Sequence, residues 1–95
     1  MLSKNQILAS VHRVYTSFIQ EWGTTLMSIA SLGAVSLPRG RRVFLRRREG
    51  DGPVLCVQFN GEFIGGRRGV VAEFDSLSFG DQLDICMDFE AMCRR

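Results

Sequence analysis

The sequence predicts a single α+β domain over residues 1–95, made of an N-terminal helical part (1–37) followed by an antiparallel sheet (41–90). Apolar residues recur with a helical period as far as Trp22, whereas from Arg41 onward they recur at every second position. Clusters of Gly, Asn, Asp and Pro separate the alternating stretches, as expected of strands joined by short turns. A chain of 95 residues can bury one modest core.

The first predicted element is an amphipathic helix over 2–22. Ser3 and Gln6 have the spacing of a capping box, in which each side chain bonds the backbone amide of the other residue. One broad face of this helix is apolar, and it comprises Ile7, Leu8, Val11, Val14, Tyr15, Phe18, Ile19 and Trp22. Such a wide face is typical of a helix that packs on a sheet. The Gly-Thr-Thr stretch at 23–25 leaves two alternatives, a longer kinked helix or a second short one.

The remainder predicts a four- to five-stranded antiparallel meander, with strands over 43–48, 54–59, 62–66, 70–75 and 83–90. Asn60-Gly61 is the strongest hairpin signal, because both central residues of a type I′ turn need positive φ. In the last segment, apolar and mainly acidic residues alternate, so a strand there has one apolar and one acidic face.

Composition favours a cytoplasmic protein without a membrane segment. The three cysteines form no C-x-x-C pair, and Cys56 and Cys86 have the surroundings of small buried hydrophobes, which suits a reducing compartment. The polar first residues do not have the pattern of a signal peptide. The apolar run 26–37 is too short to cross a bilayer.

No residue set predicts catalysis, a metal site or a cofactor. His12 is the only histidine, and it lies at the edge of the apolar helix face. Metal binding needs more ligands than one histidine and scattered cysteines provide. On a strand, Asp84 and Asp88 would lie about 13 Å apart, too far for an acid and base pair. The protein is therefore predicted not to be an enzyme.

The net charge of +2 conceals a strong asymmetry along the chain. Residues 39–68 carry eight arginines against three acids, or +5, and residues 69–95 carry two arginines against six acids, or −4. In an uninterrupted meander, alternate turns lie at the same end of the sheet, so the arginines after the first, third and fifth strands should converge. The predicted partner-binding residues are Arg46, Arg47, Arg48, Arg67, Arg68, Arg94 and Arg95, with Arg41, Arg42 and Phe44 in a secondary role.

An arginine-rich edge predicts a small non-catalytic binding protein of the adaptor or inhibitor type, which modulates a protein partner with an acidic surface. The alternative partner is an RNA or DNA backbone. Phe44 between Arg42 and Arg46 on one strand face favours that alternative, since single-stranded bases stack on aromatic rings.

Two other interpretations stay open. Asp84, Asp88 and Glu90 could neutralise arginines of the same chain and leave only a solvated face. Self-association is the second, with the basic edge of one copy against the acidic face of another.

Overall fold

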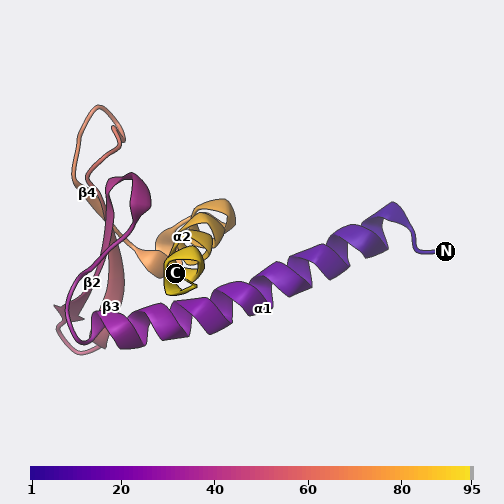
Figure 1. Ribbon diagram of the computed structural model, residues 1–95, viewed down its shortest axis with the longest axis horizontal. Helices are drawn as coiled ribbons and strands as arrows, with labels where there is room; N and C mark the ends of the chain where they lie inside the picture. The colour runs from indigo at the N-terminus through magenta and orange to yellow at the C-terminus, as the bar shows by residue number, and fades with distance from the viewer. Residues whose placement is uncertain (95) are drawn as a thin grey trace.

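The computed structural model describes residues 1–94 and confirms the α+β class, with two helices packed on a four-stranded antiparallel sheet (Figure 1). The first element, α1, is one continuous helix over Lys4–Ala30. Its capping box is present, because Ser3 Oγ accepts from the Gln6 amide and Gln6 Oε1 accepts from the Ser3 amide. Because α1 continues without a break through 23–25, the single longer helix is correct and a second short helix is wrong.

Gly23 lies inside α1 against the ring of Phe74, at a spacing that still admits a methyl group. A Cβ there would be 3.5 Å from Phe74 Cε1, which is ordinary contact. Gly23→Ala is therefore expected to raise the free energy of unfolding by about 0.5–1 kcal/mol through helix propensity. Gly61→Ala is the control, because its Cβ would be 2.5 Å from the Arg39 carbonyl oxygen, and overpacking of this kind costs about 1–2 kcal/mol. Urea unfolding of both variants measures the two shifts, which should have opposite signs.

The sheet is a meander in the order β1-β2-β3-β4, formed by Val35–Ser36, Arg41–Arg48, Gly52–Phe59 and Val70–Glu73. A 3-10 turn, η1 (Pro38–Gly40), precedes β2, and a second one, η2 (Phe74–Ser76), follows β4. The last element, α2 (Phe79–Cys93), lies with α1 on one face of the sheet (Figure 1). The core between these layers includes Leu26, Val43, Val57, Ile85 and Phe89.

The strand predicted over 83–90 is wrong, because this segment belongs to α2. Ser78 caps the helix by accepting from the Asp81 amide. Ile85, Cys86 and Phe89, at helical spacing, face the core and are buried. When Cys86 is counted as an apolar residue, the apolar positions of 83–90 fit the spacing of a helix as well as that of a strand. Because burial against α1 needs Ile85, Cys86 and Phe89 on one side, the segment is helical.

The strand predicted over 62–66 is also wrong, since β4 pairs directly with β3 through Phe59 and Val70. Residues 60–69 instead form a loop (the 60–69 loop), whose tip is a two-residue turn at Gly65-Gly66 with φ of 57° and 77°. The positive-φ turn is thus at these glycines and not at Asn60-Gly61. The Asn60 amide donates to the Gly40 carbonyl, which holds the start of the loop against η1.

Candidate binding surface

The predicted convergence of arginines at one edge does not form. Arg46, Arg47 and Arg48 end β2, beside the turn into Gly52. Arg67 and Arg68 belong to the 60–69 loop, which leaves β3 and enters β4 at the opposite end of the sheet. The reason is topological: without the predicted strand over 62–66, the 60–69 loop is the turn that directly follows the 48–52 turn, and consecutive turns of a meander lie at opposite ends of the sheet.

The two C-terminal arginines, Arg94 and Arg95, are not shown to join the arginines of β2 or those of the 60–69 loop. Arg94 follows α2 and forms an ion pair with Glu90 one turn earlier. Arg95 lies outside the residues that the structure describes.

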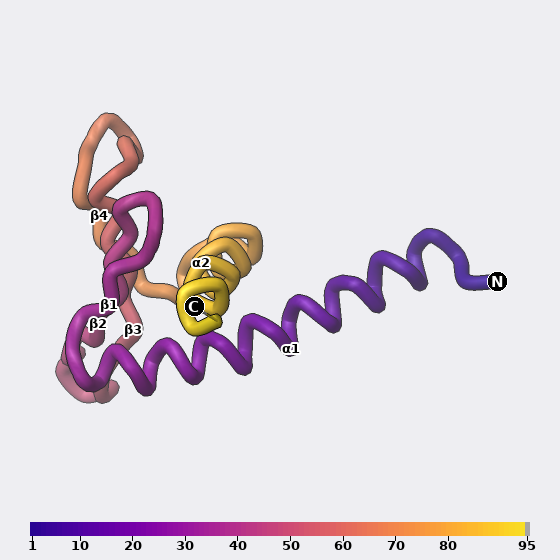
Figure 2. Tube along the Cα trace, in the orientation of Figure 1, coloured from indigo at the N-terminus to yellow at the C-terminus, as the bar shows by residue number. Residues whose placement is uncertain are grey.

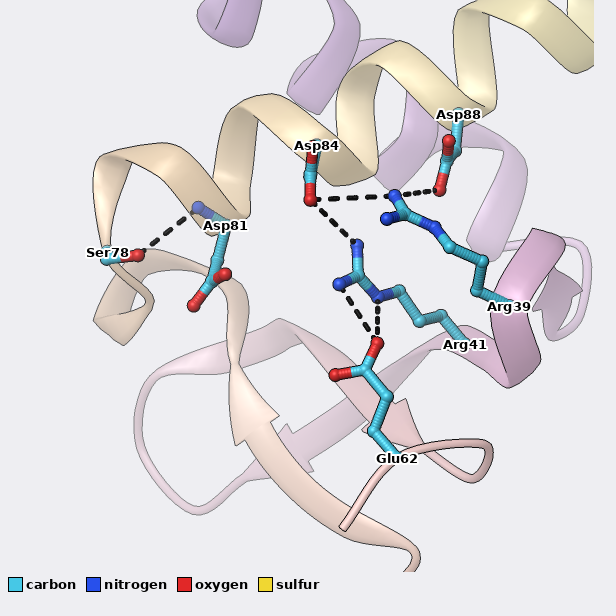
Figure 3. A network of polar contacts seen from close by, with 7 residues as sticks. All are labelled: Arg39, Arg41, Glu62, Ser78, Asp81, Asp84 and Asp88. Carbon is cyan, nitrogen blue, oxygen red and sulfur yellow. Dashed lines mark hydrogen bonds and ion pairs between the residues drawn. The ribbon is translucent and has the colours of Figure 1, made fainter. Parts of the chain in front are cut away.

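Arg41, predicted as a secondary binding residue, is a buried structural residue with 5% of its surface exposed. Its Nε and Nη2 atoms contact Glu62 Oε1 at 3.1 and 3.0 Å, and its Nη1 lies 3.7 Å from Asp84 Oδ2 (Figure 3). The guanidinium also lies over the Phe59 ring, 5.5 Å from the centroid. A buried cation needs such partners to offset the loss of its hydration. Arg41 therefore ties the 60–69 loop to α2 and is not available to a partner.

Arg39 extends this network along α2. Its Nη2 lies 2.8 Å from Asp88 Oδ2 and 3.5 Å from Asp84 Oδ2 (Figure 3). The hydrogen bond to Asp88 and the nearby charge raise the pKa of Arg39. The interpretation that acids of the same chain neutralise arginines is thus correct for Arg39 and Arg41. Asp84 and Asp88 lie four residues apart on one side of a helix, not on a strand.

The face of the sheet turned away from the helices carries a different set of side chains. Because side chains alternate along a strand, Arg42, Phe44, Arg46 and Arg48 of β2 share this face, opposite to Val43. Neighbouring strands add Val54, Gln58, Val71 and Glu73. We call this surface the open face, because no helix or strand within residues 1–94 lies over it.

At the centre of the open face, one aromatic ring lies between two cations. The guanidinium carbons of Arg42 and Arg46 are 5.7 and 6.0 Å from the centroid of the half-buried Phe44 ring. Neither arginine forms an ion pair with any carboxylate among the described residues, whereas Arg48 pairs with Glu73 at 2.6 Å. The open face therefore presents two ordered guanidinium groups without carboxylates of their own.

The 60–69 loop carries a second arginine–aromatic pair that sequence reasoning missed. Phe63 is 67% exposed, and the Arg68 guanidinium lies 4.4 Å from its ring centroid. Gln58 links the loop to the open face, since its Nε2 donates to the Gly69 carbonyl. The strand predicted over 62–66 concealed this pair, and the adjacent Gly65-Gly66 was the available signal for a turn.

The two buried cysteines are poor nucleophiles. Cys56 and Cys86 are fully buried, and burial raises the pKa of both thiols, that of Cys86 to about 11. Cys93 is exposed, and all three are free thiols. The predicted burial of Cys56 and Cys86 is confirmed.

The raised thiol pKa makes stability depend on pH in the alkaline range. The folded state holds the Cys86 proton more tightly than the unfolded chain does. The protonated thiol therefore makes its full contribution to the free energy of unfolding below the ordinary thiol pKa of 9.0, and this contribution is lost as the pH rises through the folded-state pKa of about 11. We expect the midpoint of urea unfolding to fall over this range under reducing conditions. Cys86→Ala should start from a lower midpoint but show a smaller alkaline decrease. An equal decrease in both proteins would contradict this origin.

Two further features of the described residues are a histidine–aromatic contact and a groove beside α1. His12 stacks on Phe79 with ring centroids 4.9 Å apart. A groove of about 480 Å³ lies between α1, the start of β3 and α2, lined by residues that include Gly23, Leu55, Phe74 and Phe79. In the described part of the chain, no group of three or more His, Cys, Asp or Glu side chains could hold a metal ion. No helix of residues 1–94 is long and apolar enough to cross a membrane.

Comparison with known proteins adds no assignment: no family model, curated protein or solved structure matches this chain.

Proposed function

We propose that this chain is a small non-catalytic binding protein that modulates a protein partner by holding an acidic part of its surface against the open face. The observation that supports this most directly is the Phe44 ring between Arg42 and Arg46. The three free cysteines, two of them buried, suit the reducing cytoplasm as its location.

The arrangement favours carboxylates for a physical reason. A guanidinium held over an aromatic ring has lost part of its side-chain freedom, so less conformational entropy remains to be lost when a partner binds. Its planar donors can meet a carboxylate in two parallel hydrogen bonds. Phe44, Val54 and Val71 supply half-buried apolar area beside these donors, and arginine and aromatic residues together are typical of interface centres.

Nucleic acid is the second candidate, and the exposed Phe63 with Arg68 over its ring is the observation that favours it. Single strands bind by stacking bases on aromatic rings and by arginine contacts to phosphates. The protein partner is preferred because backbone binding depends on many phosphate contacts, whereas the open face offers only Arg42 and Arg46 without internal carboxylates.

Arg42→Ala/Arg46→Ala is expected to weaken binding of the partner by about tenfold or more, because each arginine at an interface centre contributes on the order of 1 kcal/mol. The partner is first captured from a lysate of the native host on the immobilised full-length chain and identified, and its affinity for each variant is then measured by calorimetry. Arg47→Ala is the matched control, since it removes the same charge from the same strand on the opposite face.

Three outcomes decide between the candidates. Loss of capture after nuclease treatment, with affinity that falls steeply with salt for any sequence, would replace the protein partner by nucleic acid. Equal loss of affinity in Arg47→Ala and in the double variant would attribute binding to the overall positive charge of the chain and not to the open face. Unchanged affinity in the double variant would exclude the open face.

A further inference from the structure

The N-terminal half of α1 extends beyond the rest of the molecule, whereas its C-terminal half packs in the core (Figures 1 and 2). The molecule measures 48 × 34 × 30 Å, and its radius of gyration is 14.9 Å. A compact domain of this length has a radius of gyration of about 12 Å. We call residues 4–15 the projecting segment. Nothing in residues 1–94 covers its tip, which lies far from the sheet (Figure 2).

The projecting segment exposes one apolar side, whose members are Ile7, Leu8, Val11, Val14 and Tyr15, each 41–66% exposed. They continue the stripe that in the other half of α1 places Ile19 and Leu26 in the core. Monomeric proteins rarely leave a continuous apolar patch of this kind in water, so a partner surface is the usual explanation.

The order of these residues is compatible with a second copy as the partner. The five positions are symmetric about Val11, since Ile7 and Tyr15 lie four residues away on either side, and Leu8 and Val14 lie three. When two such helices run antiparallel, the Val11 side chains meet at the two-fold axis. Ile7 and Leu8 of one copy then lie level with Tyr15 and Val14 of the other. Each of these five side chains thus lies level with another of the five, so the same patch is used on both copies, as in an isologous interface.

Charge also favours the antiparallel direction. The projecting segment contains Lys4 and Arg13 but no acid, so parallel pairing would place Lys4 beside Lys4 of the other copy. In the antiparallel pair, Lys4 and Glu21 of the other copy are separated by less than one helical turn along the helix axis. Arg13 is on the polar side of the helix with Ala9, away from the contact. The two folded bodies lie at opposite ends of the pair, because each packs mainly against the C-terminal half of its α1 (Figure 1) and contacts the projecting segment at His12, whose ring stacks on Phe79.

We propose that the chain forms a two-fold dimer through antiparallel pairing of the projecting segments. Pairing would remove on the order of 1,000 Å² of surface in total, which is the lower limit for a specific interface. We therefore expect a reversible dimer with a Kd of about micromolar size. A membrane surface is a poorer occupant, because helices that lie on lipid carry many lysines and arginines on the polar side, where this segment has one arginine, Arg13, beside Asn5, Gln6 and Ser10.

Sedimentation equilibrium of the full chain between about 1 and 200 μM tests the pairing. Wild type should change from monomer to dimer across this range. Val11→Glu places two like charges at the two-fold axis and should remain monomeric at the highest concentration. Ala9→Glu adds the same charge on the opposite side of the helix and should dimerise as wild type does. Equal helicity of the two variants by circular dichroism would show that Val11→Glu has not simply unfolded.

Crosslinking tests the direction of pairing. In a Cys93→Ser background, oxidation of Leu8→Cys mixed with Val14→Cys should produce the mixed disulfide dimer in preference to either homodimer. A parallel pair would give homodimers instead. Preferential Leu8→Cys homodimer, monomeric wild type at 200 μM, or recruitment of monomeric wild type to vesicles of phosphatidylcholine and phosphatidylserine would each overturn the proposal.

Discussion

Replacing Cys86 by Asp is expected to unfold the protein, whereas the same replacement at the next residue, Met87, is expected to leave it folded. Cys86 of α2 is fully buried, while Met87 is 50% exposed. A carboxyl group in the core keeps its proton and still costs several kcal/mol. We expect a loss of more than about 4 kcal/mol, most of the stability of a domain this small.

This pair of variants distinguishes the helix from the strand that the alternation suggests. On a strand over 83–90, Met87 would face the core and Cys86 would lie in water with the acids. Far-UV circular dichroism and urea unfolding of Cys86→Asp and Met87→Asp measure the result. Stable Cys86→Asp together with unfolded Met87→Asp would contradict the helical assignment of this segment.

Arg41→Ala is expected to lower the free energy of unfolding by about 3 kcal/mol, and Arg42→Ala by less than about 0.5 kcal/mol. Arg41 is buried between Glu62, Asp84 and the Phe59 ring. Its removal takes away contacts that join the 60–69 loop to α2. This loss of stability is at the lower end of the range for breaking a buried ion pair, because the carboxylates of Glu62 and Asp84 keep substantial contact with water.

Arg41→Lys separates charge from shape in the same site. Lysine restores the positive charge but cannot contact Glu62 through two nitrogens while a third lies near Asp84, so only part of the lost stability should return. Urea unfolding of the three variants gives the comparison. Equal stability of Arg41→Ala and Arg42→Ala would contradict the structural role of Arg41.

The arginines therefore have two roles within one basic stretch of sequence. Arg39 and Arg41 hold η1, the 60–69 loop and α2 together, while Arg42 and Arg46 remain on the open face with Phe44. In the proposed antiparallel dimer, the pairing helices lie away from the sheet, so each copy keeps its open face accessible. Two open faces on one particle would strengthen binding to a partner that presents acidic sites in pairs.

Local patterns predicted several elements correctly. The capping box located the start of α1. Alternation located β2, and the nearly continuous apolar run over 54–59 located β3, both to within two residues of their observed ends. The Arg42–Phe44–Arg46 face also followed from alternation alone. These features depend on neighbours a few residues apart, which the sequence displays directly.

The sequence by itself determined the α+β class, the cap and apolar stripe of α1, the two long strands and the burial of Cys56. Only the tertiary structure decided that 83–90 is helical, because Ile85 and Cys86 are both buried against α1 and the sheet. It likewise decided which arginines are used internally, since Arg39 reaches Asp88 across 49 residues and Arg41 reaches Glu62 across 21. Burial and ion pairing act between groups that the fold brings together, so their energies have no signature in local sequence.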